Sequence, residues 1–370
     1  MTEQRSVVVI GGGLAGASSA WRLAARGHRV TLVEQFEPGH DRGASHGTSR
    51  IFRHAYEDRR YVDLAARAGR GWARLERLTG RHVYDRTGAV DHGDPVTVQR
   101  LAGVLGAAGL EFEILSPGAA QRRWPGLRFD TVAVHHPSAG RLLADEAIAG
   151  LWQAAGQAGA VLRTGTKVQA VRTPRGRAEV VLGDEVLIAD QVVIAAGAWT
   201  PALADGLLDL PRVRTTQEQP LHFPTELPLD VWPSFIHHSG AGLDIPGGIY
   251  GLASAEGVKA GEHGTGPEVD PDHRPDTRPA GVERVQAYAR EWLPGVDAER
   301  PSAVSCLYTT TPDHHFLIDR VGPVTVAAGF SGHGFKFGPA IGDLVVDLVE
   351  DRRAVTGLFA LDRRRTAAAG

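Results

Sequence analysis

Cysteine is nearly absent from the sequence, since Cys306 is the single one among 370 residues. One cysteine excludes an intramolecular disulfide framework and any zinc or iron–sulfur site built from several cysteines. Charge of one sign is also lacking: 40 basic and 43 acidic residues leave a net charge of −3, which gives no support for a nucleic-acid-binding surface. No apolar run is long enough to span a membrane, and no signal peptide precedes the first predicted strand. We therefore expect a cytoplasmic protein that binds neither nucleic acid nor membrane.

Two further absences concern catalytic chemistry. The 16 histidines include three adjacent pairs, at 135–136, 237–238 and 314–315. Neighbouring residues on a strand point to opposite faces, so these pairs lack the geometry of metal ligands and we expect no metal site. No G-x-S-x-G run is present to indicate a hydrolase.

The N-terminal residues have the pattern of a βαβ unit. The β-branched run at 6–10 predicts a buried strand, and a tight glycine turn follows at 11–16. Good helix formers predict a helix over 17–26 that ends at Gly27, and residues 29–34 predict the next strand.

Within this unit, Gly11, Gly13 and Gly16 fit the pattern G-x-G-x-x-G of a dinucleotide-binding turn. The first glycine allows the tight turn, the second lets the backbone approach a pyrophosphate, and the third permits close packing of helix and strand. Glu34 ends the second predicted strand, where a carboxylate can accept hydrogen bonds from a ribose. The pattern does not separate NAD from FAD. No second fingerprint is present, so no separate NAD(P)H site is evident beside a flavin. Electrons must then come from the substrate and leave to oxygen or a small acceptor.

In the rest of the chain, segments with α/β patterns alternate with a segment of short β-like runs. The remaining predicted elements are strands at 191–196 and 324–328, helices at 282–292 and 339–350, short β-like runs within 213–263, and a surface loop at 264–279. This order predicts an α/β Rossmann-like nucleotide-binding domain interleaved with a mainly antiparallel-sheet domain of α+β type. We place the nucleotide-binding domain at 1–85, 141–212 and 302–370, and the substrate domain at 86–140 and 213–301.

Three separated motifs carry a family resemblance, at 43–50 with 53–56, at 305–314 and at 328–337. On these motifs the chain resembles the monomeric sarcosine oxidase and N-methyltryptophan oxidase family of the glycine/D-amino-acid oxidase superfamily, almost end to end. The resemblance implies FAD as cofactor and an oxidase of a secondary amino acid, with an N-methyl, N-alkyl or cyclic amine. Hydride transfer to flavin N5 would give an imine, and O2 would reoxidise the flavin to yield H2O2. It also implies a monomer.

The resemblance assigns roles around the flavin. It implies a thioether between Cys306 and the flavin, a reaction that a thiolate can perform. His46 and Arg50 match residues beside the flavin ring, and Lys259 matches a lysine that activates oxygen. The segment that includes Gly332, Gly334, Phe335 and Lys336 is also expected to contact the cofactor, with the two glycines letting the backbone pass close to the ring.

A second set of residues is expected to hold the substrate. Arg53 and Lys336 match positions that bind the substrate carboxylate, for which an arginine fork and a lysine charge are suited. His263 and Tyr250 match positions that contact the substrate amine, and Tyr308 is expected to form a wall of the pocket. We count Lys259, His263, Arg50 and Tyr308 as candidate catalytic residues.

The chain departs from this family in its predicted substrate domain. The departures are the run 217–219, the longer and polar stretch 235–242, and Glu262 in place of an aromatic residue. They favour a bulkier N-alkyl or cyclic amino acid over sarcosine. Three alternatives stay open: a cyclic imino-acid oxidase in a biosynthetic pathway, a dehydrogenase of the same fold with another electron acceptor, and a flavin-binding regulatory module without turnover.

Overall fold

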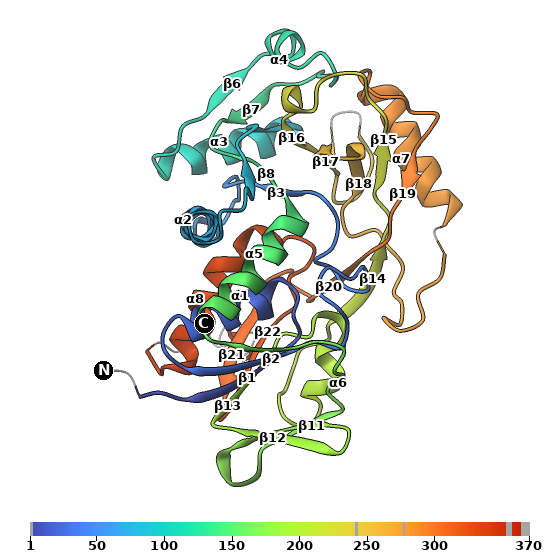
Figure 1. The fold of residues 1–370 in the computed structure, drawn as a ribbon. Helices are drawn as coiled ribbons and strands as arrows, with labels where there is room; N and C mark the ends of the chain where they lie inside the picture. The colour runs from blue at the N-terminus through green and yellow to red at the C-terminus, as the bar shows by residue number, and fades with distance from the viewer. Residues whose placement is uncertain (1–2, 241–242, 277, 353–356, 364–370) are drawn as a thin grey trace.

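A computed structural model of the chain describes residues 3–240, 243–276, 278–352 and 357–363. Two large sheets dominate the fold, and shorter pairs of strands lie between them (Figure 1). The predicted combination of a Rossmann-like α/β part and a mainly antiparallel part is confirmed.

The first large sheet has six strands in the order β21-β22-β13-β1-β2-β9. All neighbours are parallel except β21, which is antiparallel to β22. Its strands are β1 (Ser6–Ile10), β2 (Arg29–Val33), β9 (Val161–Arg163), β13 (Gln191–Ile194), β21 (Leu317–Val321) and β22 (Val324–Ala328). The strands from β22 to β9 therefore form the parallel sheet that a βαβ nucleotide-binding fold requires.

This sheet is covered on both faces, which explains its apolar strands. One face packs against a helical layer, with Val7 and Val9 in its core. The layer contains α1 (Leu14–Ala24), α2 (Arg59–Thr79), α5 (Ala144–Gln157) and α8 (Gly338–Val349). Val8 and Ile10 point to the other face. There they meet a three-stranded sheet of β10 (Ala170–Arg172), β11 (Ala178–Leu182) and β12 (Glu185–Ala189), with α6 (Thr200–Ala204) beside it.

The second large sheet has eight strands in the order β19-β15-β18-β17-β16-β5-β7-β6. All its neighbours are antiparallel except the parallel pair β5 and β16. Its strands are β5 (Ala89–Gly93), β6 (Glu113–Leu115), β7 (Ala133–His136), β15 (Leu221–Phe223), β16 (Ser234–His238), β17 (Ile249–Ser254), β18 (Gly257–Glu262) and β19 (Ser302–Ala303). The helices α3 (Pro95–Ala107), α4 (Pro117–Arg123) and α7 (Pro279–Trp292) flank it (Figure 1).

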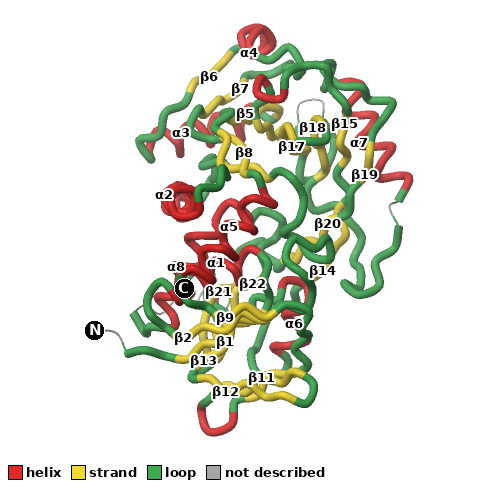
Figure 2. Tube along the Cα trace, in the orientation of Figure 1, coloured by secondary structure: helices red, strands yellow, loops and turns green. Residues whose placement is uncertain are grey.

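Short elements connect the two sheets, and loops converge between them (Figure 2). They are the pair β14 (Arg214–Glu218) and β20 (Cys306–Thr310), the sheet of β3 (Arg50–Phe52), β8 (Gly140–Leu142) and β4 (Tyr84–Asp85), and the 3-10 turns Gly197–Trp199 and Phe335–Phe337. Two further 3-10 turns lie within sheets: Pro174–Gly176 joins β10 to β11, and Leu229–Val231 lies between β15 and β16. Several predicted site residues begin or occupy these connections, among them Arg50, Cys306 and Lys336.

Element boundaries differ from the predictions in a few places. Helix α1 begins at Leu14, three residues before the predicted start. The last glycine of the pattern, Gly16, therefore lies inside the first turn of the helix and not in the loop before it. A Cβ on Gly16 would lie 1.7 Å from the carbonyl oxygen of Gly11, so the third glycine permits the close helix–strand packing that the pattern requires. The loop at 264–279 contains only isolated bridges among its described residues, as predicted, up to the start of α7 at Pro279. Residues 241, 242 and 277, which fall in the stretch 235–242 and in this loop, lie outside the described residues.

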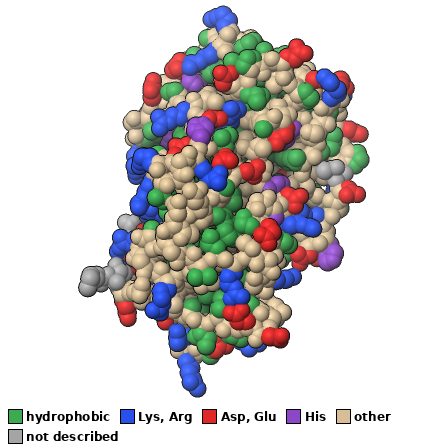
Figure 3. All heavy atoms as spheres, in the orientation of Figure 1, with side chains coloured by type: hydrophobic (Ala, Val, Ile, Leu, Met, Phe, Trp, Pro, Cys, Tyr) green, Lys and Arg blue, Asp and Glu red, His purple; other side chains and the backbone are tan. Residues whose placement is uncertain are grey.

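None of the described helices is long and apolar enough to cross a membrane. On the face shown in Figure 3, basic and acidic side chains are interspersed. This mixture agrees with the small net charge of the chain.

Candidate active site

A cavity of about 780 Å³ is lined by residues from both large sheets and from the connections between them. Its wall contains every predicted site residue except Gly16: Gly11, Gly13, Glu34, His46, Arg50, Arg53, Tyr250, Lys259, His263, Cys306, Tyr308, Gly332, Gly334, Phe335 and Lys336. These residues span more than 300 positions of the chain, so the fold brings the nucleotide fingerprint and the C-terminal motifs to one space.

At one end of the cavity, the loop between β1 and α1 is held by polar contacts. Gly12 donates its backbone N–H to Oε2 of Glu34 at 2.6 Å, and Phe36 donates to Oε1 at 2.9 Å. Trp152 donates from Nε1 to the carbonyl of Gly12 at 2.8 Å. A Cβ on Gly12 would lie 2.2 Å from the Trp152 ring, so only glycine fits here. Trp152 was not found from the sequence, because it comes from α5, 140 residues away.

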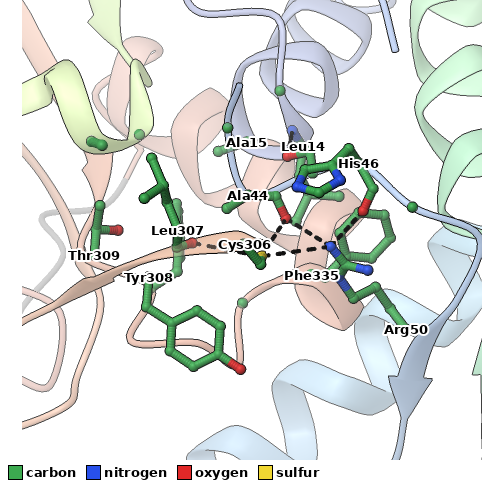
Figure 4. A pocket seen from close by; sticks show the side chains of 18 of the residues that line it. Leu14, Ala15, Ala44, His46, Arg50, Cys306, Leu307, Tyr308, Thr309 and Phe335 are labelled. Atoms are coloured by element: carbon green, nitrogen blue, oxygen red, sulfur yellow. Dashed lines mark hydrogen bonds between the residues drawn. The ribbon is translucent and has the colours of Figure 1, made fainter. Parts of the chain in front are cut away.

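Cys306, the first residue of β20, lies deep in the cavity beside Arg50 (Figure 4). Its Sγ is 4.0 Å from Nη2 of Arg50 and 4.0 Å from the carbonyl oxygen of Ala44. The same guanidinium donates to the carbonyl of His46 at 2.6 Å and lies over the ring of Phe335, 5.5 Å from its centroid. The cysteine sulfur, the guanidinium and the Phe335 ring therefore line one part of the cavity wall.

Two titratable side chains near this cysteine, Lys259 and His46, have lowered pKa values. Burial, and then the charge of Arg50, lower the pKa of Lys259 to about 7. Its Nζ donates to the carbonyl of Ser49 at 2.7 Å. Burial and Arg50 also lower the pKa of His46 to about 4, and Nε2 of His46 is buried without a hydrogen-bond partner among the described residues. Such an orphaned group next to a cavity fits contact with a bound molecule.

A second cluster in the cavity is cationic. Nζ of Lys336 donates to Oη of Tyr56 and to the carbonyl of His333, both at 2.8 Å. The guanidinium of Arg53 lies over the ring of Tyr56, 4.9 Å from its centroid. Burial, and then the charge of Arg53, lower the pKa of Lys336 well below its ordinary value. The side chains of Arg53 and Lys336 both lie over the ring of Tyr56, so they bring N–H donors, of the kind that a carboxylate accepts, to one part of the cavity. Tyr56 lies within the motif at 53–56, so the sequence contained the signal for it.

The wall beside these cations is aromatic. Tyr250 and Tyr308 both line this wall, and the rings of His263 and Tyr308 lie 5.5 Å apart. Burial, followed by Lys336 and Arg53, lowers the pKa of His263 to about 4. Gly332 has φ +75°, and a Cβ there would lie 2.1 Å from the Tyr308 ring. The protein's own packing therefore requires this glycine.

The cavity fits the chemistry of a bound dinucleotide. At one end it offers a glycine loop with no room for side chains and the N-terminus of α1, which favours phosphate groups. Around Cys306 it offers Lys259, Arg50 and His46, whose Nε2 has no hydrogen-bond partner among the described residues. Among the described residues, no group of three or more His, Cys, Asp or Glu side chains has the arrangement of a metal site.

Comparison with known proteins gives one family and many full-length relatives. Residues 6–348 match the family model DAO, described as FAD dependent oxidoreductase. The chain is 34% identical to monomeric sarcosine oxidase of Streptomyces avermitilis, with 100% of each chain covered. It is 31% identical to monomeric sarcosine oxidase of a Bacillus species, with 94% of this chain and 93% of that one covered. Among solved structures, NikD, an amino acid oxidase of nikkomycin biosynthesis, superposes with a TM-score of 0.84 at 24% identity and covers 96% of both chains.

Proposed function

The chain belongs to the DAO family of FAD-dependent oxidoreductases, and on that premise we propose that it is an FAD-dependent oxidase of secondary amino acids. The observation that carries the proposal is the single cavity that joins the glycine loop to Cys306, Lys259 and the pair Arg53 and Lys336. A dinucleotide end, an oxygen-activating cation and a carboxylate site are the three parts that such an oxidase needs.

Residues of both ends would hold FAD. The loop that contains Gly11 and Gly13, with the N-terminus of α1, would take the phosphates. Glu34 would take the ribose, since its carboxylate has lone pairs beyond the two used by backbone N–H groups. His46, Arg50 and the segment that contains Gly332, Gly334 and Phe335 would lie at the ring. When bound, FAD would accept a hydride, which carries two electrons, from the carbon beside the substrate nitrogen, and would pass the two electrons to O2, giving H2O2.

We propose that Cys306 forms a thioether with this cofactor. The support is its position in the cavity wall, 4.0 Å from the Arg50 guanidinium. A thiolate is the nucleophile in such a bond: it would add to the 8α carbon of the flavin, that carbon would lose a proton, and the two electrons left on the reduced cofactor would pass to O2. Arg50 would stabilise negative charge at the ring.

The remaining residues would bind and orient the substrate. Arg53 and Lys336 would hold its carboxylate, which fixes the reacting carbon in place. His263 stays neutral near pH 7, since its pKa is about 4. It can therefore accept a hydrogen bond from the substrate amine. Tyr250 and Tyr308 would close the wall around the reacting carbon, and Lys259 would stabilise the charge that forms as oxygen is reduced.

We propose a narrower class of substrate than secondary amino acids in general. Ile236 and His238, from the stretch that departs from the family, line the same cavity as Arg53 and Lys336. We propose that this wall favours an N-alkyl or cyclic amino acid with a larger side chain than sarcosine. We further propose that the enzyme is a cytoplasmic monomer, divided into the two domains with the limits predicted above.

A substrate panel on the purified, FAD-containing protein tests the proposal. Sarcosine, N-methylalanine, N-methylleucine, proline and pipecolate are each mixed with the protein without oxygen, and loss of the yellow colour is followed. We expect bleaching by at least one secondary amino acid and rapid return of colour with H2O2 in air. Formaldehyde release separates N-demethylation from oxidation of a ring. If no amine bleaches the flavin, the proposal is wrong. If bleached protein stays colourless in air until a quinone is added, the protein is a dehydrogenase.

A further inference from the structure

A carboxylate that no predicted role explains lies directly behind the cationic cluster. Asp91 is in the middle of β5, and its side chain is fully buried. Its Oδ1 lies 3.3 Å from Nη1 of Arg53 and accepts a hydrogen bond of 2.8 Å from Nε2 of His238. On the other side, Nε2 of His136 lies 3.4 Å from Oδ2. The three partners come from three different segments of the chain, and Asp91 contacts all of them.

A buried carboxylate is costly unless positive groups and hydrogen bonds surround it. Burial alone would raise the pKa of Asp91, but Arg53, His136 and His238 more than offset that effect and hold it well below the ordinary value. Asp91 is therefore ionised, and it supplies the buried counter-charge of Arg53 at the cavity wall.

The contacts of Arg53 also fix its orientation. Nη1 is used on the protein side, because it donates both to Asp91 and to the carbonyl of Ala55. Nε and Nη2 have no hydrogen-bond partner among the described residues, and the side chain lines the cavity. A guanidinium is a rigid planar fork, so anchoring one edge determines where the other edge points.

We propose that Asp91 is a positioning residue for substrate binding, which anchors one edge of the Arg53 fork so that the other edge meets the substrate carboxylate. His238 donates to the same oxygen of Asp91 that Arg53 contacts, and it itself lines the cavity. The polar stretch in which this chain departs from its family is thereby tied to the carboxylate site. The proposal rests on the role given to Arg53 in the proposed function.

Binding of a carboxylate without an oxidisable amine tests this role. Butyrate is titrated into the FAD-containing protein, with butyramide as its uncharged match, and the change in flavin absorption gives Kd. We expect Asp91→Ala to raise the Kd of butyrate about tenfold and Asp91→Asn about threefold, since an amide oxygen can still accept from Arg53. Butyramide binding and FAD content should not change. With a substrate from the panel, KM should rise by similar factors while kcat changes less.

A double-mutant cycle separates positioning from a general loss of structure. In the background of Arg53→Met, Asp91→Asn should have no further effect on the Kd of butyrate. Glu350→Gln is the matched control, because Glu350 is also buried and lies beside Arg26 and His28 but not in the cavity wall. It should leave both Kd values unchanged.

Several outcomes overturn the proposal. Unchanged or tighter butyrate binding in Asp91→Asn would mean that Asp91 acts only as an opposing charge or not at all. An equal loss in the Arg53→Met background would mean that it does not act through Arg53. If Asp91→Ala does not fold, Asp91→Asn alone decides. Failure of the wild type to bind butyrate would remove the carboxylate site itself, whereas failure of the substrate panel would contradict the oxidase and leave the butyrate result valid.

Discussion

Nζ of Lys259 donates a hydrogen bond of 2.7 Å to the backbone carbonyl of Ser49, the residue just before Arg50. This contact ties β18 of the eight-stranded sheet to the loop that enters β3. It places an ammonium group beside a guanidinium in the wall of the cavity, where burial and Arg50 lower the pKa of Lys259 to about 7. The contact therefore fixes the position of the Lys259 side chain relative to Arg50 in the cavity wall.

Lys259→Met should slow the reaction of the reduced enzyme with oxygen by about a hundredfold, because a fixed cation that stabilises developing charge is lost. Anaerobic reduction by substrate should change much less. With a pKa of about 7 the ammonium form predominates below pH 7 and is lost above it, so reoxidation in the wild type should slow as pH rises through that range. Stopped-flow mixing of reduced protein with oxygenated buffer from pH 5 to 9 measures both effects. Lys259→Arg should remain fast and lose the pH dependence, since a guanidinium stays protonated. Equal oxygen rates in the wild type and Lys259→Met would contradict the role.

Cys306→Ala should release the cofactor. We expect acid-denatured wild-type protein to keep its yellow colour and flavin fluorescence, because a thioether survives denaturation, and we expect the variant to lose both to the supernatant. Denaturing gels viewed under ultraviolet light, together with mass spectrometry, measure the bond. Release of free FAD from the wild type would make Cys306 a structural residue.

The glycine loop gives a steric prediction. In Gly12→Ala the added methyl group would lie 2.2 Å from the Trp152 ring and 3.1 Å from Cβ of Glu34. We expect FAD content on purification to fall well below one per chain, with a loss of about 1–3 kcal/mol in the free energy of unfolding from overpacking. Absorbance ratios and denaturant titration measure the two effects. Gly103→Ala is the matched control, because Gly103 lies within α3 with no neighbour within 4 Å of the added Cβ. It should retain FAD and be slightly more stable.

Local patterns in the sequence predicted the parts of this fold that are built locally. The strand at 6–10 and the glycine turn were recognised because period, β-branching and glycine spacing are properties of neighbouring residues. The helix at 339–350 was predicted within one residue at each end. Helix α2 was not predicted, although its buried Tyr61, Ala65, Ala68 and Trp72 follow helical spacing, so the signal was present.

Contacts that depend on sheet register were beyond local patterns. The histidine pairs at 135–136 and 237–238 were correctly predicted to place adjacent side chains on opposite faces. The parallel register of β5 with β16 and the antiparallel register of β5 with β7 bring one member of each pair to Asp91. Residues 147 positions apart meet there, and no property of either sequence segment alone specifies that meeting.

His263 supplies a prediction about which group sets the pH dependence of catalysis. Burial, then Lys336 and Arg53, hold its pKa at about 4. This is below its ordinary value near 6.5, so the ring is neutral throughout pH 6–9 and does not titrate there. We expect any change of kcat/KM with pH in that range to keep its midpoint in His263→Gln, which retains a neutral hydrogen-bonding side chain. His263→Leu should lower kcat/KM about tenfold at every pH without moving the midpoint, because the hydrogen bond to the substrate amine is lost. Initial rates of H2O2 formation across the range measure both variants. Disappearance of the pH dependence in His263→Gln would mean that the imidazole titrates near neutrality in the free enzyme, since kcat/KM reports groups of the free enzyme, and would contradict the pKa of about 4.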